Sequence, residues 1–200
     1  MTSELQPISR NHYFDPHKES WTTKLLPGEY CVCPQGEMVV TTLGSCIAAC
    51  IRDRKLGIGG MNHFMLPQSD HGEWAGVALS ARYGNYAMEH LINEILKKGG
   101  SRQNLEASIF GGGSVSGETQ LQVGKNNAQF AEEYLNMESI RLIEKDVGQD
   151  YARKVYYQPK SGETFVKKLP VLPNETVKDR EKDYAKSLDD TAISGNVELF

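Results

Sequence analysis

The first half of the chain carries short runs of apolar residues separated by glycines and charged residues. Runs rich in valine, threonine and isoleucine at such short lengths predict strands. Three strands are expected, over residues 38–43, 46–53 and 57–66. The segment before them, residues 1–26, is polar and aperiodic, which predicts a loosely ordered arm.

A helical period replaces this pattern between residues 81 and 98. Apolar positions recur there at intervals of three and four, which predicts one face packed into the core. These positions are Ala87, Met88, Leu91, Ile92 and Ile95. Ser80 is predicted to cap the start of this helix, and Gly99 to stop it.

The second half of the chain continues the mixture of strands and helices. A helix is expected from Asn126 or Asn127 to about Asn136. Strands are expected over 105–110, 140–146, 152–158 and 164–169, with a hairpin turn at 159–162. Past Pro173, a charged run predicts either a short solvated helix or a disordered tail.

These elements predict an α/β (α+β) layered domain. A length of 200 residues fits a single domain with a substantial core. The expected division is an arm at 1–26, a folded domain at 27–173 and a charged tail at 174–200.

Charge and hydropathy narrow the classes of function. A formal net charge of −4 argues against a broad basic surface for nucleic acid or anionic lipid. No apolar run approaches the length of a membrane span, and residues 1–10 lack the apolar stretch of a signal peptide. A cytoplasmic location is therefore expected, and in that reducing compartment the four cysteines are expected to be thiols.

Cys46 and His63 are the residues whose spacing best suits catalysis. A hairpin symmetric about the 54–55 bond makes them direct cross-strand partners, with Cβ atoms ~5 Å apart. An adjacent imidazole generates the nucleophilic thiolate and later protonates the leaving group. Gly44 and Ser45 are expected to form a tight turn that aims backbone N–H groups at an oxyanion.

The alternative interpretation of this pair is structural. A single cysteine on a strand is more often a small buried apolar residue, and a single histidine is more often a hydrogen-bonded partner. Spacing alone leaves both interpretations open.

Spacing disfavours two other kinds of site. Cys31 and Cys33 are one residue apart, and Cys46 and Cys50 three apart, whereas a zinc knuckle usually has two intervening residues. The Gly-Gly-Gly-Ser segment at 111–114 lacks the lysine of a P-loop and is expected to be a tight strand exit that walls the active site. No metal and no cofactor are therefore expected.

Several motifs resemble those of the CheD chemoreceptor glutamine deamidases, between residues 26 and 169. Leu-Gly-Ser-Cys at 43–46 and His-Phe-Met-Leu-Pro at 63–67 are specific in combination. Further similar segments lie at 26–30, 49–53, 60–62, 83–96, 109–114, 140–146 and 153–162.

The resemblance implies stacked, mainly antiparallel β-sheets with flanking helices, similar to the cytotoxic necrotizing factor toxins. It implies that Cys46 attacks a receptor glutamine with His63 as its base, and that water then releases glutamate from a thioester. The family's third catalytic residue resembles a threonine six positions before the cysteine, where this chain has Val40. Thr41, Thr42 or the carbonyl of Val40 are the alternatives for orienting His63, and Thr41 is favoured because it adjoins the family's position.

The resemblance also implies partners, namely the cytoplasmic helices of chemoreceptors. Two other functions stay open: an interaction module that binds a CheC-type phosphatase, and a different cysteine acyl-transfer enzyme. The presence of both Cys46 and His63 favours the deamidase over the interaction module.

Overall fold

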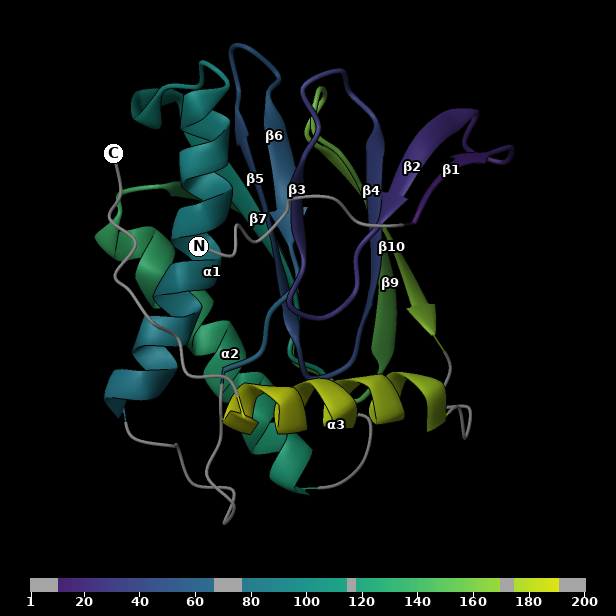
Figure 1. Ribbon diagram of the computed structural model, residues 1–200, viewed down its shortest axis with the longest axis vertical. Coiled ribbons are helices and arrows are strands. Elements are labelled where there is room, and N and C mark those ends of the chain that lie inside the picture. The colour runs from purple at the N-terminus through teal and green to yellow at the C-terminus, as the bar shows by residue number, and fades with distance from the viewer. Residues whose placement is uncertain (1–10, 67–76, 115–117, 170–174, 191–200) are drawn as a thin grey trace.

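The computed structural model describes residues 11–66, 77–114, 118–169 and 175–190. Two five-stranded sheets are stacked face to face (Figure 1). Helices α1 (Val77–Lys97) and α2 (Glu118–Met137) cover the outer face of one sheet, and α3 (Glu175–Asp190) lies across one end of both sheets. The expected layered α+β class is confirmed.

The first sheet has the strand order β1-β2-β4-β9-β10. Its strands are β1 (His12–Asp15), β2 (Ser20–Lys24), β4 (Met38–Leu43), β9 (Ala152–Gln158) and β10 (Glu163–Leu169). β2 runs parallel to β4, and the other neighbouring strands are antiparallel. The expectation of a loosely ordered arm is wrong for residues 12–24, because β2 pairs with β4 and buries Thr22 and Thr23 against it.

The second sheet has the strand order β3-β6-β5-β7-β8. Its strands are β3 (Tyr30–Val32), β6 (Gly59–Asn62), β5 (Ile47–Asp53), β7 (Leu105–Gly111) and β8 (Arg141–Val147). β7 and β8 are parallel, and the remaining pairs are antiparallel, so both sheets are mainly antiparallel as expected. The expected likeness to the toxin fold stays a prediction.

The central strand β5 of the second sheet is buried on both faces, which explains its nearly continuous apolar sequence. Ile47, Ala49 and Ile51 pack against α1 and α2. Ala48 and Cys50, on the opposite face, pack into the layer between the sheets. A strand covered on both sides has no solvent-facing positions, so its polar alternation disappears.

β5 and β6 form the expected hairpin, but in a different register. Cys50 is paired with Met61, whereas the predicted register pairs it with residue 59. The prediction that Cys46 directly faces His63 is therefore wrong by two residues. Because side chains alternate with a period of two, this even shift keeps Cys46 and His63 on the same face.

The turn between these strands accounts for the shift. The Asp53 carboxylate accepts hydrogen bonds from the backbone N–H groups of Lys55 (2.8 Å) and Leu56 (3.0 Å). Gly57 adopts a left-handed φ of 70° and so belongs to the turn rather than to β6. The hairpin is consequently symmetric about the 55–56 bond.

The two long helices begin earlier than predicted. α1 starts at Val77, so the prediction of Ser80 as its cap is wrong. α2 starts at Glu118, so Asn126 and Asn127 lie inside it, and the prediction of either as a cap is also wrong. The predicted apolar stripe of α1 is confirmed as core, with Met88, Leu91, Ile92 and Ile95 fully buried.

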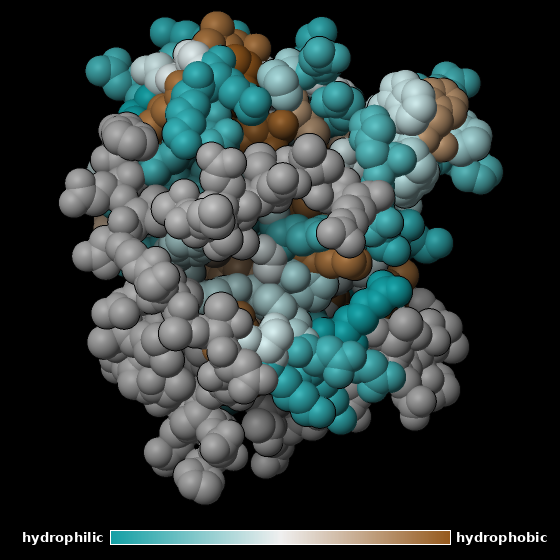
Figure 2. Space-filling view, viewed as in Figure 1, coloured by the Kyte–Doolittle hydropathy of each residue, from teal (hydrophilic) through white to brown (hydrophobic). Residues whose placement is uncertain are grey.

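α3 forms from the charged run past Pro173, and its outer surface is hydrophilic (Figure 2). Its inner side buries Glu181 (4% exposed) and Leu188, with Tyr184 half-buried between them. Residues 175–190 therefore form a docked helix, which corrects the expectation of a solvated helix or a disordered tail. None of the helices described is long and apolar enough to cross a membrane.

Candidate active site

Residues 44–46 form the bend by which the chain passes from β4 in the first sheet to β5 in the second. Three successive backbone N–H groups in this bend converge on one carboxylate, that of Glu181. Gly44 N and Cys46 N donate to Oε1 at 2.8 and 3.2 Å, and Ser45 N donates to Oε2 at 3.0 Å. Consecutive N–H groups of this kind form an anion-binding nest.

The carbonyl groups of the bend are fixed from the opposite side. Gly112 N donates to the Cys46 carbonyl at 2.8 Å, and Gly113 N donates to the Gly44 carbonyl at 2.7 Å. Asn127 Nδ2 donates to the Ser45 carbonyl at 2.9 Å. The glycine segment is therefore a tight strand exit that walls the bend, as predicted, and it keeps the N–H groups pointing the other way.

His63 follows β6 and is held by its backbone and by its ring. Its N–H donates to the Glu29 carbonyl at 2.9 Å, and its own carbonyl accepts from Gly28 N at 2.8 Å. The ring Nδ1 lies 2.8 Å from Thr41 Oγ1, which also donates to the Leu25 carbonyl at 3.0 Å. Because the threonine proton is used on Leu25, the hydroxyl accepts from Nδ1–H, and the free lone pair of the imidazole is on Nε2.

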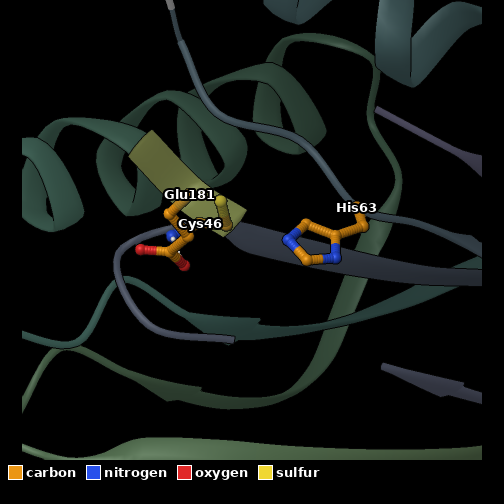
Figure 3. A group of neighbouring side chains, drawn as sticks. All are labelled: Cys46, His63 and Glu181. Atoms are coloured by element: carbon orange, nitrogen blue, oxygen red, sulfur yellow. Dashed lines mark hydrogen bonds between the residues drawn. The ribbon is translucent and has the colours of Figure 1, made fainter. Parts of the chain in front are cut away.

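Cys46, His63 and Glu181 converge from the bend, the end of β6 and α3 (Figure 3). The sulfur of Cys46, a ring nitrogen of His63 and a carboxylate oxygen of Glu181 all lie within 4.8 Å of one another. His63 Nε2 is buried and has no hydrogen-bond partner in the part of the chain that the structure describes. A base with an unused lone pair thus stands beside a thiol.

Burial decides the protonation states of this pair. It raises the pKa of the Cys46 thiol well above its usual value, and the charge of Glu181 raises that pKa further. Burial lowers the pKa of His63 to about 4, although Glu181 acts in the opposite direction. At neutral pH the site therefore holds a neutral thiol and a neutral imidazole.

The same three residues offer the donor types of a zinc site. The carboxylate of Glu181, however, already has its acceptor positions filled. Oε1 accepts from two N–H groups, and Oε2 accepts from Ser45 N and from Ser45 Oγ at 2.8 Å. A carboxylate has about four lone-pair positions, so this one is committed to the bend rather than to a metal.

Of the three alternatives for orienting His63, Thr41 is the one whose side chain is hydrogen-bonded to the ring. Thr42 is half-buried and lines a cleft beside the site. The Val40 carbonyl accepts a hydrogen bond from Leu25 N at 2.9 Å. The roles of these residues in catalysis stay predictions.

Sequence reasoning missed two residues that shape the site. Glu181 lies in a charged run that gave no signal for burial, and Asn127 was predicted only as a helix cap. The side chain of Asn127 instead bridges two segments, since its Oδ1 accepts from Leu66 N at 2.9 Å while its Nδ2 donates to the bend.

Comparison with known proteins identifies the family. The family described as CheD chemotactic sensory transduction matches residues 65–168. A protein of Janthinobacterium sp. (strain Marseille), named "Probable chemoreceptor glutamine deamidase CheD", is 50% identical over 99% of this chain and 99% of its own length. The chain belongs to the CheD family.

Other CheD proteins are similarly close. A relative from Herminiimonas arsenicoxydans is 50% identical over 96% of both chains, and one from Halorhodospira halophila is 52% identical over 95% of this chain and 89% of its own. Both have the same name as the Janthinobacterium protein. The similarity thus extends over the sheets, the bend and nearly the whole length of the chain.

Proposed function

We propose that the protein deamidates glutamine side chains of chemoreceptors, with Cys46 as the nucleophile. The observation that carries the proposal is the pairing of a buried thiol and a free imidazole nitrogen beside three convergent N–H groups. Nucleophile, base and anion-binding nest are the three parts that acyl transfer from an amide requires. The names of the CheD relatives supply the substrate.

The geometry supports a definite sequence of steps. Nε2 of His63 takes the thiol proton of Cys46, and the sulfur attacks the carboxamide carbon of the substrate. The oxygen that becomes negative is stabilised by the N–H groups of the bend. His63 then returns the proton to the departing ammonia, leaving a thioester.

Hydrolysis of the thioester completes the cycle. His63 accepts a proton from water, the resulting hydroxide attacks the thioester carbon, and the tetrahedral intermediate expels the Cys46 sulfur, which is reprotonated. The product is a glutamate side chain. Thr41 acts through His63 and is a positioning residue, because its hydroxyl fixes Nδ1 as the protonated nitrogen.

The proposal includes the expected setting of this chemistry. The protein acts in the cytoplasm, where the partner is the cytoplasmic helical region of a chemoreceptor. Association with a CheC-type phosphatase is a further expected partnership, and a pull-down of that phosphatase on the purified chain tests it.

Intact-mass measurement of a receptor cytoplasmic fragment tests the activity. The fragment is incubated with the parent protein, with Cys46→Ala and with Cys50→Ala. The parent and Cys50→Ala are expected to convert glutamine to glutamate, and Cys46→Ala to convert none. Conversion by Cys46→Ala at the parental rate would refute the role of this thiol.

A further inference from the structure

Glu181 makes an unusual use of a glutamate side chain. It is 4% exposed, and its carboxylate receives three backbone N–H groups and one hydroxyl from the bend that carries Cys46. A glutamate carboxylate is also the product of glutamine deamidation. The chain therefore places, beside its own nucleophile, the chemical group that the reaction creates.

We propose that α3 occupies the substrate-binding surface as a bound product would, with Glu181 in the position of the newly formed glutamate. A substrate helix must then displace α3 before its glutamine reaches Cys46. This inference rests on the proposed deamidase function for the identity of the substrate residue. The inference says where the substrate docks, namely on the surface that α3 covers, and that its glutamine is presented on a helix. It also says that the site is covered by α3 when no substrate is bound.

The contacts of Glu181 exclude a role in orienting the base. A residue that orients His63 must contact Nδ1, and Thr41 already holds that nitrogen. Glu181 instead fills the nest that must be empty when the oxyanion forms. Its charge also opposes the thiolate, since it raises the pKa of Cys46.

Besides Glu181, the described side chains that anchor α3 include Tyr184. The hydroxyl of Tyr184 is hydrogen-bonded to that of Tyr83. A Cβ added to Gly28 would lie only 2.7 Å from Cε2 of the Tyr184 ring. The absence of a side chain at Gly28 therefore makes room for this ring. Leu188 is buried and Ala185 packs against the core between the sheets, so the docked side of α3 combines one carboxylate with a short apolar face. Another helix that presents the same groups could take its place.

A small cleft lies between α3 and the rest of the fold. Its lining combines Val177, Arg180 and Glu181 of α3 with residues 24–27, Thr42 and His63. Three apolar residues lie on the same side of α3 as Glu181. Val177 is four positions before it, and the half-buried Tyr184 and Ala185 are three and four positions after it. The surface thus fits a helix with a central glutamine flanked by apolar side chains on the same face.

Glu181→Gln tests the placement directly, because it turns the occupant into a substrate. The sulfur of Cys46 would bond to the introduced amide carbon, ammonia would leave with the proton from His63, and water would cleave the thioester to restore glutamate. Peptide mass mapping is expected to show conversion at position 181 with time. The double variant Glu181→Gln with Cys46→Ala is expected to keep its amide.

Glu181→Ala tests the occlusion, with Asp183→Ala as the matched control on the exposed side of the same helix. Removing the Glu181 carboxylate from the nest is expected to increase both alkylation of Cys46 by iodoacetamide and receptor deamidation by at least about fivefold. Asp183→Ala is expected to match the parent. Circular dichroism and urea unfolding confirm that each variant is folded.

The outcomes separate this inference from the proposed function. Self-conversion at position 181 without conversion of any receptor glutamine supports the placement of α3 and refutes the receptor as substrate. Receptor conversion with a stable amide at position 181 overturns the placement. Equal alkylation of Cys46 in Glu181→Ala and the parent, or loss of receptor activity in Glu181→Ala, overturns the occlusion.

Discussion

Thr41 shows how one hydroxyl sets the chemistry of a neighbouring ring. It donates to the Leu25 carbonyl and therefore must accept from His63, which leaves Nε2 unprotonated beside the thiol. The tautomer of His63 is thus decided by the main-chain carbonyl of Leu25, one residue removed from the ring.

We predict that Thr41→Ala lowers kcat without abolishing activity. The loss should be smaller than the roughly 10²- to 10⁴-fold that general-base catalysis itself contributes, because the base remains but is less well oriented. Thr41→Ser, which keeps the hydroxyl, should recover most of the rate, and Thr42→Ala should be close to parental. Steady-state kinetics on a receptor fragment decides among these, and full activity in Thr41→Ala would mean that the hydroxyl does not orient His63.

His63 also predicts how stability depends on pH. Its pKa is about 4 in the folded protein, below the ordinary value of 6.5, because burial disfavours the charged ring. Between these values the unfolded chain binds a proton that the folded chain does not, so the free energy of unfolding falls as pH falls from about 6.5 towards 4. Urea unfolding at pH 7.5 and pH 5 should show a larger decrease for the parent than for His63→Gln. Equal decreases in the two proteins would contradict the shift.

At the scale of elements, the short Gly44–Cys46 bend depends on its neighbours for its shape. Its carbonyls are bonded by Gly112, Gly113 and Asn127, so its N–H groups remain available to an anion. The bend is positioned jointly by the exit of β7 and by α2, two elements far from it in sequence.

We predict that Gly111→Ala disables the site, whereas Gly99→Ala is milder. Both glycines have left-handed φ angles, 118° and 102°, so both substitutions carry a backbone cost of about 1–3 kcal/mol. A Cβ at position 111 would also lie 2.0 Å from the Cys46 carbonyl oxygen, whereas one at position 99 has nothing within 4 Å. Only Gly111→Ala should therefore displace the bend. Parallel urea unfolding and kinetics would expose the difference, and equal kinetics in the two variants would count against it.

The elements that the sequence predicts best are those whose pattern has a local cause. β4 and β9 have their predicted bounds, because each is a short run bounded by clear turn residues. The hairpin register was missed, because it depends on the Asp53 side chain capping its own turn. The burial of Glu181 was also missed, because a charge in a charged run becomes buried only through a nest built elsewhere in the chain.

At the scale of the molecule, the four cysteines are dispersed in the layer between the sheets. Cys31 and Cys33 have sulfurs 3.8 Å apart, and among the residues described Cys46 is the one cysteine placed within a group of three metal-type donors. In that group, the Glu181 carboxylate already accepts hydrogen bonds from three N–H groups and one hydroxyl of the bend.

We predict that the protein needs no metal. Chelator-treated protein should retain its circular dichroism spectrum, its melting temperature and its deamidase activity, and elemental analysis should find far less than one zinc per chain. Stoichiometric zinc, or activity that returns only when zinc is added back, would show that the Cys46, His63 and Glu181 donors serve a metal instead.

The three residues of the proposed mechanism belong to different layers of the fold. Thr41 lies in the first sheet, His63 follows a strand of the second, and Cys46 sits where the chain crosses between them. On the proposed mechanism, a nascent or partly denatured chain has a thiol without its base and without its oxyanion-binding bend, and we expect it not to deamidate bystander proteins. Folding itself would then restrict the activity to chains whose two sheets have closed on each other.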